Sequence, residues 1–313
     1  MAHSESSLKI DLALQGGGSH GAFTWGVLDR LLEDGDLQIT GISGTSAGAL
    51  NAGVMVTGLA AGGPEGAREA LRDFWRDVSV SGQIFSPFSL SQQANAGGTA
   101  NFDKLPGYQW VTSFWRTFSP YEFNPLNLNP LREVVRRHVD VAALHHCHEK
   151  RPAVRLFVAA TSVHTGQARL FTGDELSIDA LLASACLPFM FQAVEIDGEP
   201  YWDGGYAGNP AIYPLIYYTE ALDILLVKIN PLRREGKPTR SVEIIDRLSE
   251  ITFNTSLMAE MRAIAFVSRL LRERKLDPGH YKDLRMHMIA DDEGLAPFNA
   301  SSKFNTEWTF LGQ

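Results

Sequence analysis

The sequence predicts an α/β fold with a mainly parallel central sheet flanked by helices, and two units near its start carry this prediction. An apolar run at 10–14 stops at a glycine triplet, after which apolar residues recur at helical spacing. A second run at 37–42 stops at another glycine turn, before a small-residue helix that we expect to end near residue 59. Strand and helix alternation favours parallel strands, whose carboxyl ends gather the sites. Both glycine turns should therefore lie at one edge of the sheet.

Composition predicts a soluble globular protein and excludes some function classes. The 313 residues are 44% hydrophobic and 20% charged, and no Pro/Ser-rich linker divides them, so we expect one domain over 1–313. The net charge of -8 argues against binding to nucleic acid. Cys147 and Cys186 are too few for a disulfide framework, and the N-terminus lacks an apolar signal core. We therefore expect cytoplasmic residence.

The remaining elements follow from local patterns. We expect strands at 155–161, 168–171, 193–197, 223–229 and 286–289, where β-branched and aromatic residues concentrate. Apolar residues from Ile244 to Leu271 fit one face of a long helix over 240–275, which we expect to pack on the core rather than bind a membrane. Aromatic residues occupy 10 of the positions 85–123. Residues 85–130 are therefore either a cap with an apolar binding surface or ordinary core.

The first glycine turn allows three interpretations. Gly16-x-Gly18-x-x-Gly21 satisfies the dinucleotide fingerprint, but the position where that fingerprint requires an acidic residue holds Ile42-Ser43-Gly44. Backbone N–H groups at a helix N-terminus can also stabilise an oxyanion during acyl transfer. The third interpretation is a tight turn without chemistry.

The second glycine turn predicts a nucleophile. Gly44-x-Ser46-x-Gly48 lies between a predicted strand and a predicted helix, which is the context of a nucleophile elbow. Small neighbours permit the cramped turn that lifts the serine hydroxyl out of the chain. A serine nucleophile requires a base within hydrogen-bond reach, so the mechanism depends on which residue supplies it.

Histidines are the first candidates for that base, and none is well placed. His280 lies in a polar stretch and His287 lies inside a predicted strand, so we expect each to be a solvated or a core histidine. The cluster of His145, His146, Cys147 and His148 resembles a metal patch. Adjacent residues on a helix point in different directions, however, and the spacing matches no familiar zinc pattern. We therefore expect no metal site.

An acidic residue is the second candidate. Asp203-Gly204-Gly205 follows a predicted strand, turn and strand, which would expose the carboxylate sharply. Asp-Gly-Gly is common in turns, so by itself this triplet is weak.

Taken together, the motifs resemble the patatin-like phospholipase family, whose signature is a glycine-rich turn, then Gly-x-Ser-x-Gly, and later Asp-Gly-Gly. The resemblance spans about 8–230 and includes 183–188 and Asn209-Pro210. It implies a three-layer sandwich, Ser46 as nucleophile, Asp203 as general base, and oxyanion donors from Gly16, Gly17 and Gly18. It also implies an acyl-enzyme intermediate, with no cofactor, metal or catalytic histidine.

Two features qualify this resemblance. A carboxylate of ordinary pKa, near 4, is a weak base for a serine proton, so the site must be poor in water. His20 occupies a position where many relatives carry Arg or Lys, and we expect a cation there that titrates near neutral pH.

The predicted substrate is a lipid or another acyl ester, with peripheral membrane contact. A soluble carboxylesterase or thioesterase is the alternative enzyme. A nucleotide-binding or scaffold protein is the alternative without catalysis.

Overall fold

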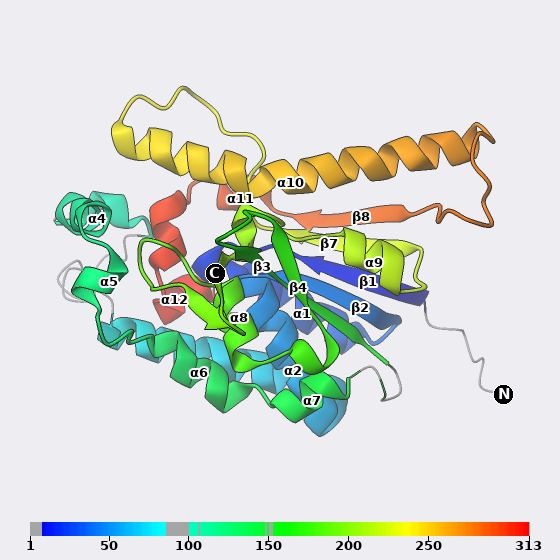
Figure 1. Cartoon of the computed structure of the whole chain (residues 1–313), viewed down its shortest axis with the longest axis horizontal. Helices are drawn as coiled ribbons and strands as arrows, with labels where there is room; N and C mark the ends of the chain where they lie inside the picture. Colours follow the sequence, from blue (N-terminus) through cyan, green and yellow to red (C-terminus); the bar gives the residue numbers. More distant parts are fainter. Residues whose placement is uncertain (1–7, 86–99, 106, 148, 150–152, 313) are drawn as a thin grey trace.

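The computed structural model describes residues 8–85, 100–105, 107–147, 149 and 153–312. Its centre is an eight-stranded sheet in the order β5-β6-β3-β2-β1-β7-β8, with β4 paired to β3 (Figure 1). Five strands are parallel: β1 (Leu8–Leu14), β2 (Leu37–Thr45), β3 (Arg155–Ser162), β7 (Asp223–Lys228) and β8 (Arg285–Ala290). Three are antiparallel: β4 (Ala168–Phe171), β5 (Val194–Ile196) and β6 (Glu199–Asp203). The predicted mainly parallel sheet is confirmed.

Helices cover both faces of this sheet, so the molecule has three layers (Figure 1). One layer holds α1 (Gly21–Asp34), α2 (Ala47–Phe85), α6 (Pro130–His138), α7 (Val141–His145) and α8 (Ile178–Ser184). The other holds α9 (Tyr213–Tyr218) and α10 (Ser241–Arg272). Side chains alternate along β1, because Leu12 and Leu14 enter the core under the first layer while Ala13 enters the core under the second.

Shorter helices complete the chain and lie mostly at one end. They are α4 (Tyr108–Thr117), α5 (Pro120–Phe123), α11 (Asp292–Leu295) and α12 (Trp308–Leu311). The helix predicted to end near residue 59 instead continues to a break at Gly62 and Gly63, where the backbone is not helical. Pro64 then begins a second helical segment, which runs to Phe85.

The long helix α10 packs on the core along only half of its length. Leu257 and Ile264 are buried and Met261 packs against them, as predicted. In the first half, Ile244, Leu248 and Ile251 are exposed. The expectation of a single core-packed face is therefore wrong for this half, because the helix extends past the edge of the sheet it covers (Figure 1).

The aromatic-rich segment contains both core and surface. Residues 86–99 lie outside the described residues. Phe102, Leu105 and Tyr108 form a small buried cluster, whereas Trp110 on α4 is 83% exposed. Each of the two interpretations thus fits part of the segment. None of the helices in the described ranges reaches the apolar length that a bilayer crossing needs.

Candidate active site

The register of three neighbouring strands brings Ser46 and Asp203 together. Thr45 on β2 pairs with Ala159 on β3, and the next residue of β3, Ala160, pairs with Asp203 on β6. Ser46 follows Thr45 directly, so it stands level with Asp203 on the other side of β3. The Ser46 hydroxyl lies close enough to the Asp203 carboxylate to lower the pKa of that carboxyl. Residues 157 positions apart thus share one site at the carboxyl edge of the parallel strands.

Ser46 sits on a strained turn that its neighbours hold in place. Its φ is 53°, in the left-handed region that a side chain rarely adopts. A Cβ at Gly48 would lie 2.2 Å from the Leu14 carbonyl oxygen, so only glycine allows this approach. The Ser46 N–H donates to Ser184 Oγ (2.8 Å), whose hydroxyl in turn donates to the Ala159 carbonyl (2.6 Å). Helix α2 begins at the next residue and directs its positive end toward the serine.

The Asp203 carboxyl is buried, with 1% of the residue exposed. Burial raises the pKa of Asp203 to about 6, while the Gly205 N–H, the Ser46 hydroxyl and the charge of Lys303 oppose this rise. The Gly205 N–H donates to Asp203 Oδ1 at 2.7 Å. A carboxylate with this raised pKa beside a hydroxyl can accept the hydroxyl proton as it leaves.

The glycine turn lies directly against the serine. A Cβ at Gly16 would be 2.6 Å from the Ser46 Cβ, so the turn can approach only because Gly16 has no side chain. The Gly16 N–H donates to Asn209 Oδ1 (2.7 Å), and the Gly16 carbonyl accepts from Asn209 Nδ2 (3.2 Å) and Asn230 Nδ2 (2.6 Å). Because the Gly16 N–H already has an acceptor, Gly17 and Gly18 are the better candidates for donors to a ligand.

A buried amide network supports this turn, and the sequence analysis missed it. Gln15 Oε1 accepts from the N–H groups of Ile229 and Asn230, each at 2.8 Å. Gln15 Nε2 donates to Asn254 Oδ1 (2.9 Å) and to the Asn209 carbonyl (3.3 Å). Two of these residues carry a local signal, since Gln15 follows β1 directly and Asn230 comes just after β7. A polar side chain at the carboxyl end of a buried parallel strand is a site candidate.

The remaining motif glycines occupy the ends of elements. Gly21 begins α1, and its carbonyl accepts from Asn51 Nδ2 at 3.0 Å. Gly44 lies near the end of β2, and Gly204 begins the 3-10 segment Gly204–Tyr206 after Asp203.

His20 does not supply a titratable cation, and the expectation that it does is wrong. Its ring is buried, bonds Ser302 Oγ at 2.7 Å and packs against Phe298 and Phe310. Burial, together with the charges of Lys303 and Arg234, lowers the pKa of His20 to about 3. His20 is therefore neutral at neutral pH.

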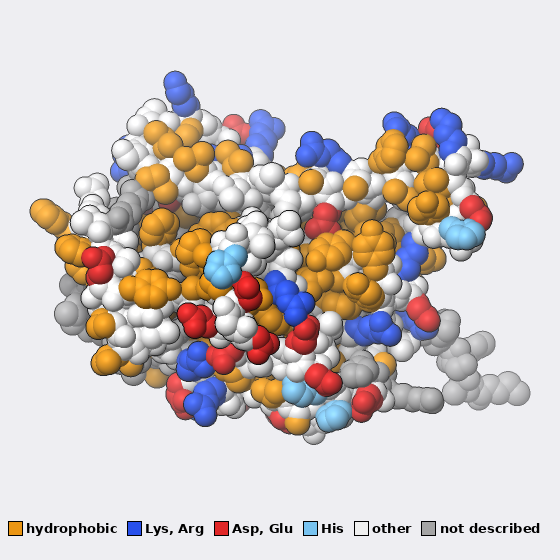
Figure 2. Space-filling view, viewed as in Figure 1, with side chains coloured by type: hydrophobic (Ala, Val, Ile, Leu, Met, Phe, Trp, Pro, Cys, Tyr) orange, Lys and Arg blue, Asp and Glu red, His pale blue; other side chains and the backbone are white. Residues whose placement is uncertain are grey.

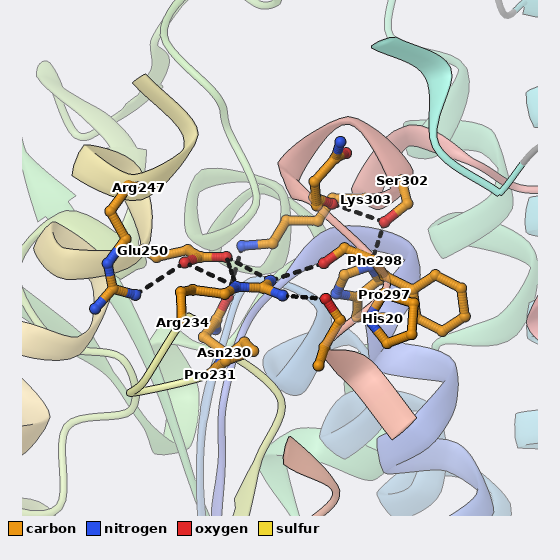
Figure 3. A network of polar contacts seen from close by, with 12 residues as sticks. His20, Asn230, Pro231, Arg234, Arg247, Glu250, Pro297, Phe298, Ser302 and Lys303 are labelled. Carbon is orange, nitrogen blue, oxygen red and sulfur yellow. Dashed lines mark hydrogen bonds and ion pairs between the residues drawn. The ribbon is translucent and has the colours of Figure 1, made fainter. Parts of the chain in front are cut away.

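A different cation, Lys303, reaches the site from the C-terminal segment. Its Nζ donates to Asn230 Oδ1 at 2.6 Å and lies 5.6 Å from the centre of the Phe253 ring. Figure 3 shows Ser302 directed toward His20, while the Lys303 side chain extends from the same segment toward Asn230 and Glu250. No local sequence pattern marked this residue.

The histidines considered as alternative bases bind carboxylates elsewhere. His280 pairs with Asp277 at 2.7 Å, and His287 pairs with Asp223 at 2.8 Å on the β7–β8 side of the sheet. Both side chains are exposed, so each is a solvated histidine and neither belongs to the core.

The candidate metal patch does not assemble. His145 bonds the Leu176 carbonyl (2.7 Å) and His146 bonds Glu149 (3.1 Å), while His148 lies outside the described residues. In the part of the chain that the structure describes, no three His, Cys, Asp or Glu side chains are arranged to hold a metal ion.

Comparisons with known proteins address the family and the fold. The sequence model of the patatin-like phospholipase family matches residues 12–216. VipD from Legionella pneumophila is similar in structure, with a TM-score of 0.42 and 15% identity over 98% of this chain and 67% of that chain. ExoU in the heterodimeric ExoU-SpcU complex of Pseudomonas aeruginosa gives a TM-score of 0.35 and 20% identity over 82% of this chain, which spans 52% of that chain. No curated protein matches this chain in sequence.

Proposed function

This chain belongs to the patatin-like phospholipase family, and we propose that it hydrolyses carboxylic esters of lipids through a catalytic dyad of Ser46 and Asp203. The family implies a hydrolase acting on lipid esters. The observation that carries the finer proposal is the strand register that places Ser46 level with the buried Asp203 carboxylate across β3.

In the proposed mechanism, Ser46 Oγ attacks the ester carbonyl while its proton passes to Asp203. The tetrahedral oxyanion accepts hydrogen bonds from the N–H groups of Gly17 and Gly18, and the positive end of α2 adds to its stabilisation. Collapse breaks the bond to the alcohol, which leaves with the proton from Asp203, and the acyl group stays on Ser46. Water then gives a proton to Asp203 and attacks the acyl carbonyl. The second tetrahedral intermediate breaks its bond to Ser46 Oγ, which takes the proton back from Asp203, and the fatty acid leaves.

The raised pKa of Asp203 supports its role as the base. A carboxylate of ordinary pKa accepts a serine proton poorly, so a carboxylate base needs a water-poor site that raises its pKa. Burial provides that condition and brings the pKa to about 6, close to the pH at which the enzyme would work. The carboxylate is then ionised at neutral pH and is more basic than a solvated one.

The surface beside the site supports a lipid substrate presented by a membrane. Several large apolar side chains are exposed on α4, on α5, between α5 and α6, and in the segment after Cys186. They are Trp110, Phe114, Tyr121, Leu126, Leu128 and Phe189. We call these six residues the apolar end. Figure 2 shows hydrophobic side chains gathered over the α4–α5 end of the molecule.

Hydrogen bonds connect the apolar end to the catalytic acid. The Ala193 N–H donates to the Tyr121 hydroxyl at 3.2 Å, and Gln192 Nε2 donates to the Asn124 carbonyl at 2.8 Å. The same segment begins at Cys186, whose carbonyl accepts from the Asp203 N–H at 2.8 Å. The segment that contacts the apolar end is thus also hydrogen-bonded to the backbone of the catalytic acid.

The first experiment measures hydrolysis of a medium-chain p-nitrophenyl ester by wild type, Ser46→Ala and Asp203→Asn. Asp197→Asn is the matched control, because Asp197 is exposed in the turn between β5 and β6. Folding of each protein is checked by circular dichroism. Loss of activity in both dyad variants but not in the control supports the proposal. An active Asp203→Asn variant would show that another residue is the base.

A second experiment separates a lipid hydrolase from an esterase for soluble substrates. Rates are compared below and above the critical micelle concentration of a short-chain phospholipid, for wild type and for Trp110→Ala with Phe189→Ala. We expect the wild-type rate to rise at the interface and the double variant to lose most of that rise. Tyr217→Ala is the control, since Tyr217 is exposed on α9, away from the apolar end. Equal rates on monomers and micelles would favour the soluble esterase.

A further inference from the structure

Lys303 forms no ion pair among the described residues, unlike Lys228 and Arg234. Lys228 is buried and pairs with Asp292, and Arg234 pairs with Glu250 at 2.7 Å. Lys303 is partly buried, and its Nζ donates to a neutral group, the Asn230 amide oxygen. Among the described side chains, no carboxylate forms an ion pair with it.

The ammonium of Lys303 lies between the glycine turn on one side and the Phe253 ring on the other. Asn230, which accepts its hydrogen bond, also donates to the Gly16 carbonyl at 2.6 Å, and so joins Lys303 to the glycine turn. The Lys303 backbone packs on the same turn, since a Cβ at Gly18 would lie 2.5 Å from its carbonyl oxygen. On the other side, the Phe253 ring lies under the ammonium.

Phe253 also contacts the segment that carries the catalytic acid. A Cβ at Gly205 would be 3.3 Å from the Phe253 ring, and the Phe253 and Tyr206 ring centres are 5.2 Å apart. The charge of Lys303 lowers the pKa of Asp203. Lys303 thus lies beside both the glycine turn and Phe253, which packs on the segment after Asp203.

Nearby acids attract Lys303 only from beyond ion-pair distance. They are Glu250, Asp246 and Asp203. Glu250 is already bound by Arg234 and Arg247, and the pKa of Asp246 is raised to about 6 by burial and by the charges of Asp103 and Glu250. Burial lowers the pKa of Lys303 itself. A desolvated cation without a bound anion is costly, so an anionic ligand would be stabilised here.

The C-terminal segment is fixed in a way that holds Lys303 in place. Arg234 donates to the carbonyls of Ala296 (2.5 Å) and Phe298 (2.7 Å), and Ser302, the neighbour of Lys303, bonds His20 (Figure 3). A cation held in this way loses little conformational freedom when a ligand binds.

We propose that Lys303 binds the phosphate of the substrate lipid, and so favours phosphate-bearing lipid esters over uncharged ones. This inference rests on the proposed lipid hydrolase function and adds the class of head group. The phosphate of a glycerophospholipid lies a few bonds from its ester carbonyls, which matches an ammonium beside the dyad. Charge-assisted hydrogen bonds to phosphate are among the stronger polar contacts in proteins.

The test measures binding without turnover. In a Ser46→Ala background, we would titrate a non-cleavable short-chain diether phospholipid, the matching diether glycerol without phosphate, and inorganic phosphate, by calorimetry below micelle formation. We expect Lys303→Gln to weaken binding of the diether phospholipid roughly tenfold or more, relative to its effect on binding of the diether glycerol. Lys303→Arg should keep most of the preference. Lys275→Gln, which removes an exposed lysine paired with Glu273, should leave the preference unchanged.

Each outcome decides the inference. Equal weakening of both diethers by Lys303→Gln, or no weakening, overturns it. Tight binding of inorganic phosphate that depends on Lys303, with no preference between the diethers, would assign the site to free phosphate and also overturns it. Since the assay needs no hydrolysis, a preference that depends on Lys303 in a protein inert on every ester would count against the proposed function and not against the phosphate site.

Discussion

Asn209 and Gly16, 193 residues apart, exchange two hydrogen bonds, so that one side-chain amide satisfies both backbone groups of the glycine. The pair joins the segment after the catalytic acid to the turn beside Ser46. The side chain at Asn209 therefore sets where the Gly17 and Gly18 N–H groups point. Asn209 touches no reacting atom, and we regard it as a positioning residue.

Replacing Asn209 with Ala should lower kcat more than it changes KM. The turn would lose its fixed geometry, and a displacement of about 1 Å can cost on the order of a hundredfold in rate. We expect a fall in kcat of about tenfold to a hundredfold and a loss of about 1 to 3 kcal/mol in unfolding free energy. Ester hydrolysis and urea unfolding measure both.

The matched control for this change is Asn129→Ala. Asn129 caps α6 by accepting from the Leu131 N–H at 3.0 Å, away from the site. Its loss should cost about 1 kcal/mol of stability and leave kcat unchanged. Identical kcat values for the two variants would rule out a positioning role for Asn209.

Activity should depend on the ionisation of Asp203. A general base must be deprotonated, so the rate should be full above the Asp203 pKa of about 6 and fall roughly tenfold per pH unit below it. The pH dependence of kcat/KM on a monomeric ester measures this pKa. His20→Gln should not move it, because His20 is neutral throughout this range. A profile flat down to about pH 4 would exclude a buried carboxylate as the base.

Asp203→Asn should be inactive yet more stable at alkaline pH. The folded pKa of about 6 exceeds the ordinary value of 3.8 for an aspartate, so ionisation opposes folding. This cost is absent below about pH 4, grows as pH rises to about 6, and is complete above it. Removing the charge should therefore add about 1 to 3 kcal/mol to the unfolding free energy at pH 8 and little near pH 4. The same gain at both pH values in urea unfolding would refute this explanation.

Sequence patterns predicted those parts of the molecule that are set locally. Hydrophobic runs ending in glycine turns located β1 and β2, and the Gly-x-Ser-x-Gly motif placed Ser46 where the structure has its strained turn. The contacts of Gly16 with Asn209 and Asn230 could not be predicted, because they join segments far apart in sequence. These contacts depend on the register between neighbouring strands, which a single sequence does not specify.

The predictions for the first half of α10 and for His20 were wrong for related reasons. Helical periodicity identified the apolar face of α10 but not where the sheet beneath it ends, so Ile244 and Leu248 are exposed. The motif position of His20 suggested a cation. Its burial depends on the segment containing Phe298, Ser302 and Phe310, which the resemblance did not cover.

His20→Arg should therefore destabilise the protein rather than improve the site. The arginine would place a permanent charge in a buried position, next to Phe298 and Phe310 and near the charges of Lys303 and Arg234. No described carboxylate pairs with this ring, so the charge would be uncompensated, and we expect a loss of about 3 kcal/mol or more in unfolding free energy. His164→Arg is the control, because His164 is exposed beside Glu199 and should change stability by less than about 0.5 kcal/mol. A His20→Arg protein as stable as wild type, with faster phospholipid hydrolysis, would instead place the cation of the site in the glycine turn and remove that role from Lys303.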